Sequence, residues 1–162
     1  MYIMYIKLII LIILLLNNQN IYKVEPQNKK EIIGNLIINK INLDMPLYNI
    51  ESKKNNIEEN ITILKESILP PNKESIVFLA AHSGTSKISY FNNLDKLEIN
   101  DTIFLTINNT ENTYQITNIY KQKKNGYINV NKENKDQLIL TTCDPNDNKY
   151  QLIINSTKKE FN

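Results

Sequence analysis

The chain is poor in several residue types, and each shortage limits what it can be. It holds one cysteine, which excludes a fold stabilised by internal disulfides. One cysteine and one histidine are also too few for the usual ligand set of a zinc site. All 19 members of the combined lysine and arginine count are lysine, so the chain has no guanidinium group to offer to any site.

A surplus of charge is lacking too. The formal net charge over 162 residues is only +2, and lysines are interspersed with acidic residues. The sequence has no basic stripe and no interleaving of basic with aromatic residues, which argues against a nucleic-acid partner. A hydrophobic content of 41% is enough for a core, and the isoleucine content favours strands. The length fits one small domain with an N-terminal appendage.

The appendage is residues 1–16, a hydrophobic run interrupted only by Lys7. As a helix it spans about 24 Å at ~1.5 Å per residue, against ~30 Å for the hydrocarbon core of a bilayer. No small-x-small cleavage site follows it, so we expect an uncleaved membrane anchor, with a cleaved signal peptide or a core element as alternatives. Residues 17–31 are polar and predict a linker, which leaves 32–162 as the folded domain.

The folded part contains many short apolar segments separated by turn signals. The segments that we expect to form strands are Leu36–Ile38, Met45–Tyr48, Ser75–Ala81, Thr102–Ile107, Thr113–Tyr120, Leu138–Thr142 and Tyr150–Asn155. Residues 108–111 separate two of these segments and predict a hairpin. The pattern predicts a mostly-β barrel or sandwich.

Two segments favour short helices. Apolar residues recur at helical spacing within Asn55–Ser67, which makes it the best helix candidate. Tyr90–Leu97 is expected to form one or two helical turns before a turn at Asn100–Asp101.

The two scarce reactive side chains stand in matching places. Cys143 ends the apolar run that begins at Leu138, and Asp144–Pro145 then breaks the strand. His82 directly follows the apolar run Ile76–Ala81. A thiol and an imidazole, each just after a buried strand, indicate a cysteine nucleophile with a proton-transfer partner. A buried apolar cysteine and a structural histidine are the alternative interpretations.

Three segments resemble the sortases, the cysteine transpeptidases that attach surface proteins to bacterial cell walls. The family's strand-end motif, Thr-Leu-x-Thr-Cys, is matched by Ile139–Cys143, with isoleucine in place of the first threonine. Ala80–Thr85 resembles the segment of small residues around the family's histidine. Tyr90–Leu97 and the following Asn100–Asp101 are similar to the stretch that leads into the family's Gly-Asp turn. The match extends from about Ile33 to Ser156.

The resemblance implies a closed sortase-like β-barrel of about eight strands with one or two short helices. It makes 32–162 a catalytic domain in which Cys143 is the nucleophile and His82 the general acid. A free thiol is mostly protonated at neutral pH, and a neighbouring imidazolium favours the thiolate and can protonate the departing amine. No cofactor is implied.

The third catalytic position departs from the family pattern. Sortases usually place an arginine on the strand after the cysteine, and the matching residue here is Gln151. A glutamine can donate a hydrogen bond to an oxyanion but carries no charge. Lys149 lies two residues before Gln151, so its side chain would point to the same face of the strand if the strand extends that far. Whether Gln151, Lys149 or backbone N–H groups take the role stays open at this point.

The substrate implied by the resemblance is a sorting peptide similar to Leu-Pro-x-Thr-Gly, cleaved between Thr and Gly. The acyl group would pass to an amine of a peptidoglycan precursor or a pilin subunit. Thr142, Tyr127 and Ile128 are expected to contact the peptide, the last two in what resembles the loop that lines the family's peptide groove. One rival is a peptidase that passes the thioester to water, and another is an inactive barrel that only binds peptide.

A metal site is not expected. Four acidic residues near the loops suggest calcium, but they lack the spacing of a known calcium loop and favour a solvated surface. They are Asp144, Asp147, Glu133 and Asp136.

With the N-terminal anchor, the resemblance implies a single-pass protein of the cell membrane whose catalytic domain lies outside the cytoplasm.

Overall fold

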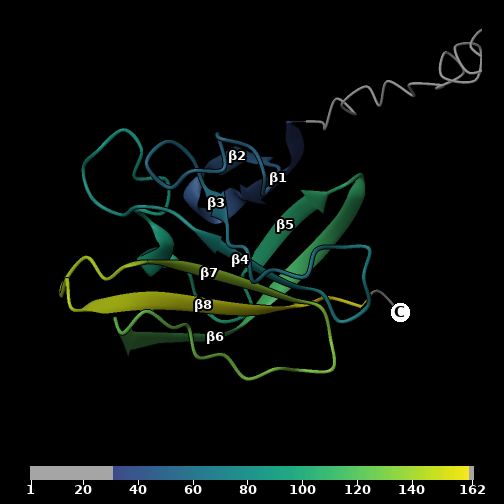
Figure 1. The fold of residues 1–162 in the computed structure, drawn as a ribbon. Coiled ribbons are helices and arrows are strands. Elements are labelled where there is room, and N and C mark those ends of the chain that lie inside the picture. Colours follow the sequence, from purple (N-terminus) through teal and green to yellow (C-terminus); the bar gives the residue numbers. More distant parts are fainter. Residues whose placement is uncertain (1–30, 161–162) are drawn as a thin grey trace, which may run out of the picture.

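A computed structural model describes residues 31–160, which form one curled sheet of eight strands (Figure 1). The predicted anchor, residues 1–16, and all but the last residue of the predicted linker lie outside the described residues. The strands are β1 (Ile32–Ile38), β2 (Leu43–Tyr48), β3 (Thr62–Ile63), β4 (Ile76–Ala80), β5 (Thr102–Ile107), β6 (Thr110–Lys123), β7 (Gln137–Cys143) and β8 (Tyr150–Lys158). The helices are two single 3-10 turns, η1 (Asn39–Ile41) and η2 (Leu94–Lys96). Within residues 31–160 no helix is long and apolar enough to span a bilayer.

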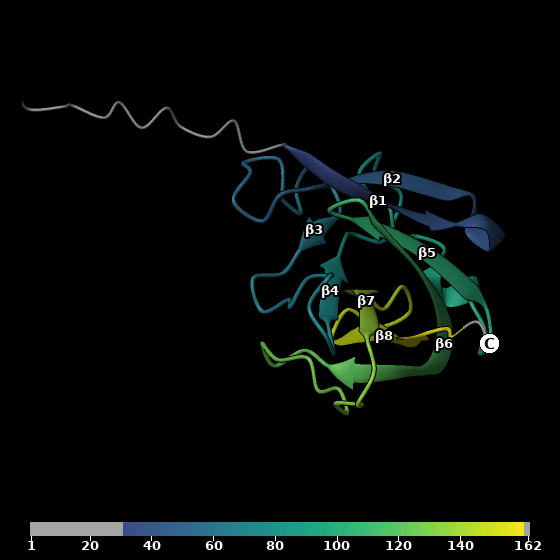
Figure 2. The same cartoon turned by 90° about the vertical axis from the view of Figure 1, so that its right-hand side faces the viewer.

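The strands follow the order β2-β1-β5-β6-β8-β7-β4-β3, and Figure 2 looks along the barrel that they enclose. All neighbouring strands pair antiparallel except β4 and β7, which run parallel. The two end strands, β2 and β3, contact each other without a hydrogen-bonded ladder between their described residues. The predicted eight-stranded barrel is therefore confirmed, with a seam between β2 and β3.

Alternation of side chains explains why these segments form the barrel wall. In β5 the three isoleucine and leucine side chains at Ile103, Leu105 and Ile107 are buried, while Phe104 between them is exposed. This period of two puts one face of the strand into the core and the other toward water. The central strand β7 differs, because its residues from Gln137 to Thr142 are all buried. A strand covered on both faces reads as a continuous apolar run, as the sequence does here.

The predicted hairpin between β5 and β6 is confirmed, although its loop is shorter than expected. Asn108 and Asn109 have φ of 52° and 64°, and Ile107 pairs directly with Thr110. Two successive residues with positive φ give the tight turn that suits the twist of a hairpin, and asparagine tolerates that conformation. As a result β6 begins at Thr110 and continues to Lys123, beyond the predicted end at Tyr120.

The predicted helix over Asn55–Ser67 is wrong. This segment is a series of turns interrupted by the short strand β3. The Asn55 side chain accepts a hydrogen bond from the Ile63 N–H at 2.7 Å and donates one to the Ile63 carbonyl at 2.9 Å. Asparagine side chains compete in this way with the helical backbone. Ile61 and Ile63 are still buried, so the apolar spacing reflects a loop packed on the core rather than a helix.

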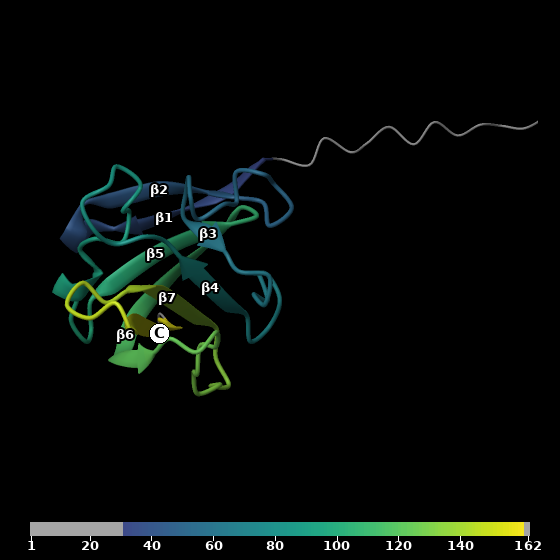
Figure 3. The same cartoon turned by 60° about the vertical axis from the view of Figure 1, so that its left-hand side comes forward.

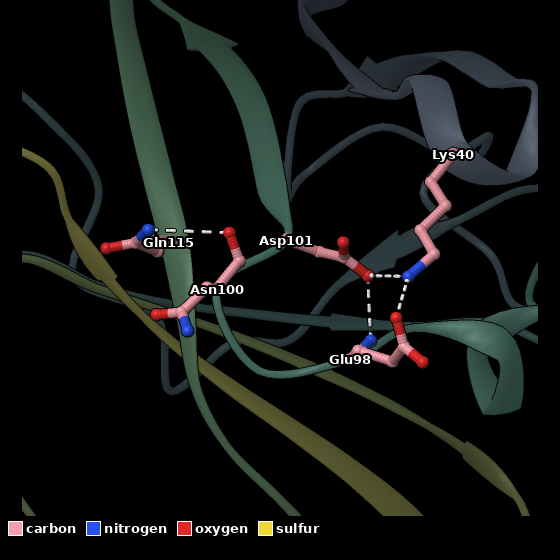
Figure 4. A network of polar contacts seen from close by, with 5 residues as sticks. All are labelled: Lys40, Glu98, Asn100, Asp101 and Gln115. Carbon is pink, nitrogen blue, oxygen red and sulfur yellow. Dashed lines mark hydrogen bonds and ion pairs between the residues drawn. The ribbon is translucent and has the colours of Figure 1, made fainter.

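The segment Tyr90–Leu97 forms less helix than predicted, a single 3-10 turn, and leads into the expected turn at Asn100–Asp101. Figure 4 shows the polar network at this turn. Asp101 accepts a hydrogen bond from the Glu98 N–H at 2.7 Å and lies 2.8 Å from the Lys40 ammonium. Hydrogen bonds to Asp101 and Glu98 raise the pKa of Lys40. The network connects η1 to the loop before β5.

Candidate active site

The parallel pair β4 and β7 brings the two reactive residues to one edge of the barrel. Ala80 pairs with Thr141, so the carboxyl ends of the two strands lie side by side (Figures 1 and 3). Cys143 is the last residue of β7, and His82 follows β4 after one residue. The Cys143 side chain is a free, exposed thiol. The alternative of a buried apolar cysteine is therefore wrong.

Two side-chain hydrogen bonds join the ends of these strands. The Thr142 hydroxyl donates to the Ala81 carbonyl at 2.8 Å, and the Ser83 hydroxyl donates to the Cys143 carbonyl at 2.8 Å. Thr142 is buried. These bonds fix the backbone on both sides of the thiol relative to the segment that carries His82. The hydroxyl proton of Thr142 is thus engaged by the Ala81 carbonyl, whereas its oxygen keeps the capacity to accept a hydrogen bond.

A groove of about 330 Å³ opens at this edge, and it contains all the residues that the sequence singled out for catalysis or binding except Lys149. It is lined by Ile57, Leu64, Ala80, Ala81, His82, Lys124, Gly126, Tyr127, Ile128, Thr141, Thr142, Cys143 and Gln151. A second hollow of about 390 Å³ shares Leu64, Gly126, Tyr127 and Ile128 with it. The shared residues make the two hollows neighbours, which gives space for a peptide longer than one residue.

The imidazole of His82 has an acidic partner that the sequence did not single out. His82 Nε2 lies 3.3 Å from the Glu58 Oε1, and about a third of the His82 side chain is exposed. Glu58 belongs to the segment that was wrongly predicted as a helix. A carboxylate in contact with one ring nitrogen orients the imidazole.

Gln151 stands directly beside Cys143, since the two residues pair across β7 and β8. Its side-chain amide donates a hydrogen bond to the Tyr127 carbonyl at 3.0 Å. Gln122 on the neighbouring strand β6 donates to the same carbonyl at 2.7 Å and accepts from the Asn129 N–H at 2.9 Å. The loop after β6 is thus held against the groove by two glutamines.

Within this loop, Tyr127 and Ile128 line both hollows. The Tyr127 side chain is 72% exposed, whereas Ile128 is half-buried. The segment around them contains no strand among its described residues. Both side chains are within the groove wall where the sequence expected them.

A lysine that the sequence did not single out forms a hydrogen bond with the thiol. Lys124 follows the end of β6, and its ammonium donates a hydrogen bond to Cys143 Sγ at 3.0 Å. Lys149, the residue considered as a substitute for the family's arginine, does not line the groove, because β8 begins at Tyr150. Among 19 lysines, nothing in the sequence distinguishes Lys124, although the absence of arginine signals that a cation must come from a lysine.

Asp144, directly after Cys143, has a buried carboxylate with a cationic partner. Its Oδ2 lies 2.7 Å from the Lys121 ammonium, and its Oδ1 accepts from the Asn146 N–H at 3.1 Å. The hydrogen bond from Lys121 holds the pKa of Asp144 below its usual value.

Asp136, another of the acidic residues considered for calcium, is paired with Lys158 at 3.3 Å. Across residues 31–160 no three His, Cys, Asp or Glu side chains cluster closely enough to hold a metal ion.

The pair of Asp144 and Lys121 makes stability depend on pH. A carboxyl whose pKa is lowered on folding stabilises the fold above its unfolded pKa, and the gain is lost as the pH falls through the folded value. We expect the isosteric variant D144N to have a lower free energy of unfolding than the parent chain at pH 7. The difference should shrink in acid, below the ordinary carboxyl range, as urea unfolding measured at several pH values would show.

The matched control is D147N in the same loop, where the exposed carboxylate accepts only the Lys149 N–H at 2.9 Å. An asparagine oxygen can accept that bond as well, so D147N should change stability little. A stability loss in D144N that stays constant from neutral pH into acid would contradict the assignment to the charged pair.

Comparison with known proteins identifies the family of the chain. The sortase domain family matches residues 36–159. Sortase A of Bacillus anthracis is 25% identical over 116 residues, which are 72% of this chain and 54% of that protein. The chain thus spans about half the length of this relative.

Solved structures of sortases have the same fold. Sortase C1 of Streptococcus agalactiae superposes with a TM-score of 0.69 at 28% identity, over 85% of this chain and 72% of that one. A lid mutant of sortase A from Corynebacterium diphtheriae gives 0.70 at 22% identity, over 81% and 72%. Sortase C-1 of Actinomyces oris gives 0.72 at 20% identity, over 82% and 75%, and these last two likenesses concern the fold alone. Because the sortase domain covers residues 36–159, the chain belongs to the sortase family.

Proposed function

We propose that the chain is a sortase-type cysteine transpeptidase that cleaves an LPXTG-like sorting signal and passes the acyl group to an amine. The observation that carries the proposal is that Cys143, His82 and Gln151 line one open groove at the strand ends of a sortase barrel. The expected acceptor is an amine of a cell-wall precursor or a pilin subunit.

In the first half-reaction the Cys143 thiolate attacks the carbonyl carbon between Thr and Gly of the peptide. The C–S bond forms, and the carbonyl π electrons move to oxygen. When this oxyanion collapses, the C–N bond breaks and the leaving amine takes a proton from the His82 imidazolium. Glu58, at 3.3 Å from the ring, supports that orientation of the imidazole.

In the second half-reaction an acceptor amine attacks the thioester carbon. The now neutral His82 takes the proton of the amine, and the Cys143 thiolate leaves as the new amide bond forms. Water in place of the amine would give a free acid by the same steps. The competition between amine and water therefore decides between transfer and hydrolysis.

Gln151 is proposed as a donor to the oxyanion. Its amide carries two N–H groups, of which one donates to the Tyr127 carbonyl. The pairing of Gln151 with Cys143 supports this role, because side chains directly opposite each other in an antiparallel pair lie on the same face of the sheet. The loss of one such donor typically costs ~3–4 kcal/mol of transition-state stabilisation, and a neutral amide supplies part of that.

The peptide is proposed to lie along the two neighbouring hollows. Ile57, Leu64 and Ala80 give the groove an apolar wall suited to leucine and proline side chains. Tyr127 and Ile128 line both hollows. Thr142 lines the first hollow next to Cys143, where it would contact the peptide close to the bond that is cleaved.

The proposed reaction predicts a covalent adduct. Incubation of the full-length chain with LPXTG-type peptides should give a thioacyl adduct on Cys143, detected by mass spectrometry, because attack precedes release. Added hydroxylamine should convert the adduct to a hydroxamic acid, an amine peptide should convert it to an amide, and C143A should give no adduct. Absence of an adduct with every sorting peptide would reduce the chain to a peptide-binding barrel. Free acid as the only product at high amine concentration would identify a hydrolase.

The role of Gln151 predicts a graded effect on the acylation rate. Q151A should lower the rate by roughly 10- to 100-fold through loss of the donor, and Q151R should keep or raise it. The control is Q122A, which removes the other hydrogen bond to the Tyr127 carbonyl and leaves Gln151 in place. An equal loss in Q122A and Q151A would mean that Gln151 only holds the loop.

The apolar run 1–16 is proposed to anchor the chain in the cell membrane with the catalytic domain outside the cytoplasm. A lysine at the centre of a spanning helix costs ~2.5–3.5 kcal/mol. The double variant I10K/I13K should therefore move from the membrane fraction to the soluble fraction of expressing cells. The parent chain should resist an alkaline carbonate wash, and its full release by that wash would refute the anchor.

A further inference from the structure

We propose that Lys124 supplies the positive charge beside the Cys143 sulfur that arginine provides elsewhere in the family. The inference rests on the proposed function, and it names a catalytic residue that neither the motif nor the family match assigns. Its ammonium donates to Cys143 Sγ at 3.0 Å. The backbone of Lys124 is held in place as well, since its N–H donates to the Lys149 carbonyl at 2.9 Å.

The charge has no other source at the expected position. The chain has no arginine, and Gln151 is neutral. Within the described part of the chain, Lys124 is the one lysine that lines the groove. A thiolate and a developing oxyanion both need positive charge or donors nearby, and a fixed charge is worth more than a neutral amide.

The charged side chains in the segments around Cys143 form ion pairs that do not include Lys124. Glu58, from the loop before β3, contacts His82, which follows β4. Asp144 after β7 is paired with Lys121 on β6. No carboxylate between residues 31 and 160 forms an ion pair with Lys124.

Tyr127 and His82 complete the titratable groups that line the groove with Lys124 and Cys143. Because no acidic side chain among residues 31–160 forms an ion pair with the Lys124 ammonium, its charge acts on the sulfur.

Lys124 takes no proton and gives none in the proposed steps. It first faces the thiolate as a counter-ion. When the C–S bond forms and the negative charge moves from sulfur to the carbonyl oxygen, the same ammonium faces the oxyanion. His82 alone carries the proton to the leaving amine. A guanidinium at this place should do the same work, whereas an uncharged side chain of similar length should not.

The test is the rate at which iodoacetamide, a neutral reagent, alkylates Cys143 across a range of pH. It needs no sorting peptide. In K124M the rate at pH 7 should fall about fivefold, the size expected for a solvent-accessible ion pair, and the profile should move to higher pH. K124R should restore the parent profile. With an LPXTG-type peptide, which covers the groove, K124M should lose on the order of 10²-fold in acylation rate.

K123M and K149M are the matched controls, because each removes a nearby lysine that does not line the groove. Both should reproduce the parent profile, and equal thermal unfolding temperatures would show that all variants fold. A K124M profile that coincides with that of the parent would overturn the proposal, as would an equal shift in K123M or K149M. Failure of the proposed function has a different signature, namely that the parent chain forms no thioacyl adduct while the alkylation profiles still differ.

Discussion

The parallel pairing of β4 with β7 is the constraint on which the rest of the site depends. Parallel strands end at the same edge of a sheet, so the residues that follow β4 meet the residues that end β7. The hydroxyls of Thr142 and Ser83 then lock the two ends together. Cys143 is exposed because β7 stops there, and Asp144 turns inward to its partner Lys121. A thiol and an imidazole far apart in sequence share a groove for this reason.

Much of the fold could be predicted from local patterns. Alternation in β5, the continuous apolar run of β7 and the asparagines of the β5–β6 turn each reflect physics that acts within a few residues. The contexts of His82 and Cys143 could also be read, since each follows an apolar run. The failure at Asn55–Ser67 has a local cause too, because the Asn55 side chain replaces helical hydrogen bonds with bonds to Ile63.

The rest of the site could not be predicted, because its contacts join segments that only the barrel brings together. Glu58 contacts His82 from a loop whose apolar spacing wrongly predicts a helix. The loop after β6 is placed by Gln122 and Gln151, whose shared target is one backbone carbonyl. Backbone carbonyls have no sequence signature. The same holds for Lys124, one lysine among 19, whose distinction is its distance to a sulfur.

A lysine at 3.0 Å from the sulfur also has a chemical consequence that an arginine would not have. In the proposed reaction, this primary amine would stand beside the activated acyl group of the thioester. As an ammonium it has no lone pair and is inert. As a free amine it would attack the thioester carbon, expel the thiolate and trap the acyl group as an amide on its own chain. In the proposed reaction, a protonated Lys124 would therefore assist the transfer, whereas a free Lys124 amine would inactivate the enzyme by accepting the acyl group itself.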